Sequence, residues 1–210
     1  MSQAAPTTPG RKIQLPELTR PLAIWLGVQL FALLLACGQV QLAARFPTNT
    51  ASVAVEEMIC VQIIASAMLF PLLLSSWRTT AACIAAAWPF VFLAGVLAER
   101  YIDRVAMASA YVSGWLLLLA IWNRLLKSPS AKMFLVAITS VIALGGPLLW
   151  YLWAEFHHGG FVSPGRLTAF TPILAAISLV RKSQPDLMLW IPLVLALGVS
   201  AALRVRTHDS

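Results

Sequence analysis

The sequence predicts an all-α membrane protein: a bundle of six spanning helices with a half-length helix before the last span. Of the 210 residues, 60% are hydrophobic and only 11% are charged, which is too few charged groups to cover the surface of a soluble chain. The apolar residues also lie in runs of about 20, the length that crosses a bilayer as a helix. Strands of a membrane barrel would be shorter and would alternate strictly, so helices are predicted.

Each predicted span is a long apolar run bounded by polar or charged residues. The six spans are Pro21–Ala43, Val53–Ser76, Thr79–Ala98, Val105–Trp122, Met133–Phe156 and Leu187–Leu203. Three regions follow from them. Residues 1–20 are predicted to be a cytoplasmic N-terminal tail, residues 21–203 the transmembrane domain, and residues 204–210 a cytoplasmic C-terminal tail.

The run Leu167–Val180, between the fifth and the last span, is too short for an ordinary crossing. Its 14 residues would reach about 21 Å as a helix, against roughly 30 Å for the hydrocarbon core of a bilayer. Pro172 interrupts even this run. A re-entrant or interfacial half-helix is therefore expected.

The protein is expected in the cytoplasmic (inner) membrane of a bacterium. The distribution of Lys and Arg residues predicts that its N-terminus lies on the cytoplasmic side of that membrane. Up to Phe156, seven basic residues fall on the side of the N-terminus and three on the other, as the positive-inside rule requires. Counting basic residues does not decide whether Leu167–Val180 crosses, because both arrangements give nine and six. Trp25, Trp77 and Trp122 are interpreted as anchors at the inner interface. The net charge of +7 lies in the loops, so nucleic-acid binding is not expected.

Glu56 and Glu57 are candidate functional residues because they lie a few residues inside the second span. Carboxylates within a membrane are functional candidates by default. Adjacent helical positions point about 100° apart, so at most one of the two is expected to face the bundle. The N-terminus of a helix also stabilises acidic side chains without any further role, and this interpretation is favoured.

The predicted outer ends of the spans gather several groups that could bind a metal. These are Glu56, Glu57, Glu99, Asp103, Glu155, His157 and His158. Glu155, His157 and His158 lack the helical spacing of paired ligands, so a solvated rim is favoured and no metal site is predicted. No phosphate-binding loop, His-Glu-x-x-His or Gly-x-Ser-x-Gly motif occurs, and no cofactor or catalytic residue is predicted.

Gly145-Gly146-Pro147 is the strongest hinge candidate. Proline breaks a backbone hydrogen bond inside a span, and two glycines add flexibility and close packing. Ser163-Pro164 is a further candidate, because this entry point to the short apolar run favours a helix that dips into the membrane and returns.

The order of these segments resembles that of the permease subunits of type-2 ABC exporters. In that family an outer re-entrant helical hairpin precedes the last span. Here Phe161–Arg166, with Ser163-Pro164, leads into Leu167–Val180 and then into the last span and a basic tail. Leu72–Thr80 is similar to the family's link between the second and third spans.

The resemblance implies a membrane subunit that forms a homodimer or heterodimer and is energised by a separate cytoplasmic ATPase. The loop Ser75–Thr80 is shorter than the family's, and Pro16 interrupts the segment Ile13–Arg20, where the family has an interfacial helix. The leading hypothesis is therefore a permease-like transport subunit in the lipid bilayer. The alternatives are a membrane scaffold or assembly factor that docks partners at its outer rim, and a membrane enzyme that acts at the outer surface through Glu155, His157 or His158.

Overall fold

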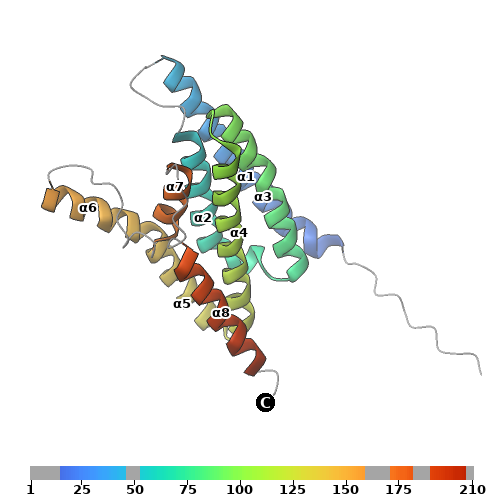
Figure 1. The fold of residues 1–210 in the computed structure, drawn as a ribbon. Helices are drawn as coiled ribbons and strands as arrows, with labels where there is room; N and C mark the ends of the chain where they lie inside the picture. Colours follow the sequence, from blue (N-terminus) through green and yellow to red (C-terminus); the bar gives the residue numbers. More distant parts are fainter. Residues whose placement is uncertain (1–14, 46–52, 159–170, 182–189, 207–210) are drawn as a thin grey trace, which may run out of the picture.

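The computed structural model describes residues 15–45, 53–158, 171–181 and 190–206, and every regular element among them is a helix (Figure 1). The elements are α1 (Leu15–Arg45), α2 (Val53–Leu73), α3 (Trp77–Leu97), α4 (Ile102–Leu125), α5 (Pro129–Ser140), the π-helical segment η1 (Val141–Gly145), α6 (Gly146–His158), α7 (Pro172–Arg181) and α8 (Ile191–Arg206). The predicted all-α class is confirmed for this part of the chain.

Five helices are long and apolar enough to cross a bilayer, so the chain is an integral membrane protein. They are Leu18–Leu42, Val53–Leu73, Trp77–Leu97, Ile102–Leu125 and Pro129–Leu149. The last helix, α8, has 16 residues and reaches about 24 Å, which leaves it outside this group. The membrane bundle predicted from composition is thus confirmed, whereas six complete spans are not.

Helix α1 begins at Leu15, six residues ahead of the predicted first span, and continues through Pro21. Pro16 lies in its first turn, where a missing N–H leaves no helical hydrogen bond unmade. The link from α2 to α3 is as short as the sequence indicated. Ser76 caps α3 by accepting a hydrogen bond from the Thr79 N–H at 3.1 Å, while the Thr79 hydroxyl accepts one from the Ser76 N–H at 3.0 Å.

Helix α2 is the centre of the bundle and packs against α1, α3, α4, α5 and α7. Its buried face carries the fully buried side chains Met58, Ile59, Ile63, Ala67 and Phe70. Because lipid tails are as apolar as these side chains, helix association in a bilayer depends on close packing and on hydrogen bonds between helices.

Buried polar side chains supply such hydrogen bonds. Gln62 on α2 donates to the side-chain carbonyl of Gln29 on α1 at 2.6 Å. The indole of Trp25 donates to the Cys83 carbonyl at 2.8 Å, and its side chain is fully buried. Interpreting Trp25 as an interfacial anchor was therefore wrong, because its N–H finds its partner inside the protein.

The predicted hinge lies in a helix that widens but does not break. Helix α5 passes through η1 into α6 without interruption, and Gly145-Gly146-Pro147 lies at the end of the wide turn. Proline has no N–H, and its ring collides with the carbonyl four residues earlier in an ordinary α-helix. A π-helical turn ahead of a proline is one way in which a helix accommodates the proline ring.

Helices α7 and α8 both begin near the middle of the bundle and run to opposite ends of it. The end that carries Glu56 and the first turn of α4 is called the Glu56 end, and the end with the last turn of α4 the Trp122 end. Helix α7 packs between α2 and α4, while α8 packs along α4. Trp190 meets the ring of Tyr111 edge-on at 5.4 Å between centroids, and farther along α8 the Ser200 hydroxyl accepts a hydrogen bond from the Trp122 indole at 2.7 Å.

Candidate functional site

The candidate site is centred on the carboxylate of Glu56, in the first turn of α2. Only 4% of the residue is exposed. An ionised carboxylate that is removed from water is costly unless opposite charges and hydrogen bonds replace the lost hydration.

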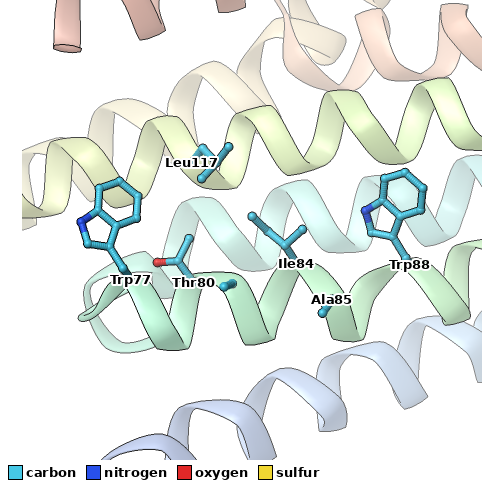
Figure 2. Close-up of a pocket in the computed structure, with 7 residues that line it drawn as sticks. Trp77, Thr80, Ile84, Ala85, Trp88 and Leu117 are labelled. Atoms are coloured by element: carbon cyan, nitrogen blue, oxygen red, sulfur yellow. The ribbon is translucent and has the colours of Figure 1, made fainter.

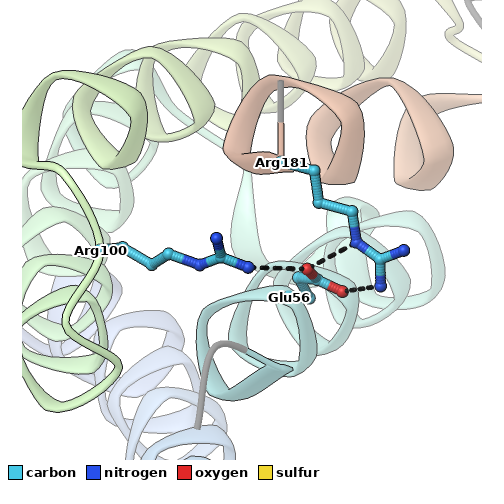
Figure 3. Close-up of polar contacts among 3 residues, drawn as sticks. All are labelled: Glu56, Arg100 and Arg181. Atoms are coloured by element: carbon cyan, nitrogen blue, oxygen red, sulfur yellow. Dashed lines mark hydrogen bonds and ion pairs between the residues drawn. The ribbon is translucent and has the colours of Figure 1, made fainter. Parts of the chain in front are cut away.

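Two arginines from distant parts of the chain surround this carboxylate (Figure 3). Arg181, the last residue of α7, donates from Nε to Oε1 at 2.7 Å and from Nη2 to Oε2 at 2.5 Å. Arg100, in the turn between α3 and α4, places Nη2 at 3.6 Å from Oε1. The paired contact of Arg181 is the two-pronged geometry that suits guanidinium and carboxylate groups best.

The helix termini favour this arrangement. Glu56 lies at the N-terminus of α2, where the helix dipole stabilises a negative charge, and Arg181 lies at the C-terminus of α7, where it stabilises a positive one. The ion pair thus joins the positive end of one helix to the negative end of its neighbour.

A specific turn places Arg100 beside Glu56. Helix α3 ends with Glu99 in the left-handed region, at φ 52°. The Glu99 N–H donates to the Val96 carbonyl at 3.2 Å, and the Arg100 N–H donates to the Gly95 carbonyl at 3.0 Å. This is the Schellman pattern of helix termination, in which glycine usually occupies the left-handed position. The turn directs the chain so that Arg100 reaches the carboxylate.

The position of Arg181 shows at which end of the bundle the short apolar helix finishes. Arg181 lies at the same end of the bundle as Glu56 and Arg100. Helix α7 has ten residues and extends over about 15 Å, half of a hydrocarbon core. Helix α7 is thus a half-length helix that ends at the Glu56 end of the bundle. The part of the predicted run before residue 171 lies outside the described residues.

The other end of α7 meets the predicted hinge. Thr171, directly before α7, lies against Gly146, and a Cβ at position 146 would collide with the Thr171 side chain. Gly145 has only one such neighbour, a methyl group of Val141 at 3.7 Å. Gly146 is therefore the glycine that close packing requires, and Pro147 follows it as a half-buried residue.

Glu57 faces away from this cluster, as the expected 100° separation implies. It lines a groove of about 380 Å³ between α1 and α2 together with Gln39, Cys60 and Leu34. The carboxyl group is hydrogen bonded to the Gln39 side chain. Of the two adjacent acids, only Glu56 faces the bundle.

Among the remaining candidates, only Glu155 has a described side chain, and it lies away from this site. Glu155 is exposed on α6, which continues directly from η1 and points away from the bundle (Figure 1). His157 and His158 end that helix, and their side chains are not described. Ser163 and Pro164 lie outside the described residues. Within the described ranges, no three His, Cys, Asp or Glu side chains are grouped as a metal site would require.

Sequence reasoning missed both arginines. The predicted half-helix stopped at Val180, one residue before Arg181, and Arg100 was interpreted only as a loop charge. One signal was available, because a carboxylate inside a span needs a cation and a re-entrant α7 leaves Arg181 at the end of the bundle where Glu56 lies.

Comparison with known proteins adds no relative, since no family model, no curated protein and no solved structure matches this chain.

Proposed function

We propose that the protein is a membrane-embedded, permease-like subunit of a transport complex, in which α7 serves as a gate at the Glu56 end. The observation that supports this proposal is a half-helix that begins in the middle of the bundle and is held at both ends. At one end it is held by the Glu56–Arg181 pair and at the other by the contact of Thr171 with Gly146.

Interrupted helices support transport for a physical reason. Helix termini leave backbone groups without helical partners, and lipid cannot satisfy them. Such termini therefore occur at membrane depth only where protein or a polar path surrounds them, and many transporters place their substrate at these interruptions. Helices α7 and α8 both begin near the midpoint of α4, where Trp190 contacts Tyr111 and Leu193 packs so closely on Gly114 that a Cβ there would collide with it.

The energy source in this proposal is a separate cytoplasmic ATPase, because the sequence has no nucleotide-binding motif of its own. A dimer of this subunit, or a heterodimer with a similar one, would form the path. Release of Arg181 from Glu56 would let α7 move, while the wide turn at η1 absorbs the displacement of Gly146. A π-helical turn suits this role because it has already lost the regular α-helical hydrogen bonds.

The proposal is tested by locking α7 to the hinge. In a chain whose three cysteines are replaced by alanine, Gly146→Cys and Thr171→Cys are introduced together. A Cβ at position 146 lies 3.0 Å from the Thr171 Cβ, close to the roughly 3.5–4.5 Å that a disulfide requires. The complex is purified from its native membranes, and ATP hydrolysis is measured before and after reduction.

We expect an ATP-hydrolysing partner to co-purify, the oxidised lock to slow its hydrolysis and reduction to restore it. Thr171→Cys alone is the control, because it carries one thiol and cannot lock. If no ATPase co-purifies, or if the oxidised and reduced complexes hydrolyse ATP at the same rate, the proposal is wrong.

The second candidate is a membrane scaffold, and the position of α6 favours it. This helix presents Leu148, Leu149, Tyr151 and Phe156 outward, with 81% of Phe156 exposed, while its own bundle covers little of it. A scaffold would bind a partner through α6 and would not need α7 to move. Under this alternative, Phe156→Ala lowers the amount of a co-purifying membrane protein and the disulfide lock has no effect.

A further inference from the structure

A groove runs along the outer face of the α3–α4 hairpin, on the side that faces away from α2 (Figure 2). Its volume is about 410 Å³. The indoles of Trp77 and Trp88 stand at its two ends. Thr80, Ala81, Ile84 and Ala85 of α3 also line it, together with Leu117 of α4.

The shape of the groove depends on large side chains at its ends and small ones between them. Trp88 is fixed in place because its N–H donates to the Ser113 hydroxyl at 3.0 Å and its ring stacks on Phe92 at 5.7 Å between centroids. Trp77 is fixed at the other end by the Arg124 guanidinium, which lies 3.8 Å from the ring centroid. Ala81 and Ala85 are exposed, so the hollow between the indoles is open to the bilayer.

The length of the groove matches one leaflet. Trp77 and Trp88 are eleven residues apart on α3, which is about 16 Å along a helix axis. Half of a bilayer core of roughly 30 Å is about 15 Å. A chain that lies between the two indoles therefore extends from the headgroup level to the bilayer centre.

Positive charge gathers at the Trp77 end. Arg78 follows Trp77 directly, Arg124 lies on its ring, and Lys127 follows the end of α4. The acidic side chains that the structure describes lie elsewhere. Glu56, Glu57, Glu99 and Asp103 belong to the opposite end of the bundle, and Glu155 belongs to α6. Clusters of Lys and Arg at the edge of membrane helices are the usual recognition element for anionic lipid headgroups.

We propose that this groove binds an anionic phospholipid, with one acyl chain between Trp77 and Trp88 and the headgroup phosphate at the exposed residues Arg78 and Lys127. A neutral lipid would fill the groove equally well but would gain nothing from these two cations. Small residues such as Ala81 and Ala85 also suit the packing of a second helix, so the test includes a measurement that distinguishes a second copy from a lipid. The proposal does not depend on transport, because it concerns a different face of the protein from α7.

The test uses the full chain in bilayers that contain both a zwitterionic and an anionic phospholipid. The bromine atoms that quench tryptophan fluorescence are placed on the acyl chains of one lipid or of the other. The signal from Trp77 and Trp88 is isolated by subtracting the quenching of a Trp77→Phe/Trp88→Phe variant. We expect these two indoles to be quenched more strongly when the anionic lipid carries the bromine.

Substitutions identify the origin of the preference. One basic residue near a membrane surface contributes about 1 kcal/mol to the binding of anionic lipid, so Lys127→Gln and Arg78→Gln should each lower the apparent affinity roughly five-fold. Ala85→Leu fills the groove and should remove the excess quenching by the brominated anionic lipid, leaving only the quenching that the surrounding bilayer produces. Ala137→Leu is the matched control, because Ala137 is exposed on α5 and lies outside the groove.

Two outcomes would overturn the proposal. The first is equal quenching by the two brominated lipids in the unaltered chain, which would show that the headgroup is not recognised. The second is efficient disulfide cross-linking of two copies through Ala85→Cys in a chain without its other cysteines, which would show that a second copy occupies the groove. Both measurements use bilayer-embedded protein and leave α7 untouched.

Discussion

Helices α6 and α7 lie on either side of residues 159–170 in the sequence, but α7 is buried in the bundle and α6 is largely exposed. Helix α7 buries Ile173, Ala176 and Val180 almost completely, whereas α6 exposes 68% of Leu149 and 81% of Phe156. Both helices are short and apolar, so hydropathy does not separate them. The difference lies in side-chain size and in charge.

Small residues allow α7 to enter the bundle. Ala175, Ala176 and Ser178 let its backbone approach α2 and α4 closely, and small residues at such contacts are the main means by which helices associate in lipid. Arg181 then ties the helix to Glu56. Helix α6 has bulky side chains and exposes its one acid, Glu155. A short apolar helix is thus held in the bundle by close packing and by one ion pair.

Removal of the Glu56 charge should produce the largest effect, because it leaves two arginines without a partner. We expect Glu56→Gln to lower the free energy of unfolding by on the order of 3 kcal/mol. At about 2–4 °C per kcal/mol for a chain of this size, the thermal midpoint in detergent should fall by several degrees. Glu57→Gln is the matched control, since it changes the neighbouring acid on the other face of α2.

A local measurement separates loss of α7 from general unfolding. Ser178 is only 3% exposed on α7, so a thiol introduced by Ser178→Cys should react slowly with a maleimide in membranes. Glu56→Gln should speed that reaction well below the unfolding temperature. A midpoint and a labelling rate that match those of Glu57→Gln would show that the ion pair does not hold α7.

The next effect tests whether close packing or the ion pair alone separates α7 from α6. Ala176 is fully buried on α7, and three added heavy atoms have no room there. Ala176→Leu should cost about 1–3 kcal/mol through overpacking. Leu149→Ala on α6 should change stability by no more than about 0.5 kcal/mol, as exposed positions do. Thermal midpoints of the two variants in the same detergent provide the comparison.

An equal loss in the two variants would contradict the comparison. A large cost for Leu149→Ala would mean that α6 is covered by a second copy or by another protein in the purified sample. That result would favour the scaffold candidate. The mass of the purified particle would then show whether a second copy or another protein covers α6.

The regular part of this fold could be predicted from sequence because hydropathy and length decide it. The predicted second span began at Val53, where α2 begins, and the predicted third span ended one residue after α3. Long-range pairing could not be predicted in the same way. Glu56 and Arg181 are 125 positions apart, and no local pattern in the sequence records which cation reaches a buried acid.

Two local preferences are met by neighbours elsewhere in the chain. Gly145-Gly146-Pro147 was expected to act as a hinge, and the structure has a continuous, widened turn, η1, that ends at its first glycine. Trp25 was assigned to the interface because tryptophan prefers it, but the Cys83 carbonyl satisfies its N–H inside the bundle. In both cases the local preference is real, and a neighbour far away in the sequence decides how it is met.

The smallest expected effect concerns the turn that presents Arg100. Glu99 pays for its left-handed backbone, at φ 52°, with roughly 1 kcal/mol of steric strain that glycine does not have. Glu99→Gly should therefore raise stability by up to about 1 kcal/mol, since its side chain is exposed and the two hydrogen bonds of the turn are made by backbone. Glu99→Ala keeps the strain and serves as the control.

If Arg100 helps to hold α7, combining Glu99→Gly with Arg181→Gln should also recover part of the slow labelling at Ser178→Cys, because the better-formed turn keeps Arg100 on the Glu56 carboxylate. If labelling stays fast, Arg181 alone ties α7 to the bundle and the turn only closes the α3–α4 hairpin.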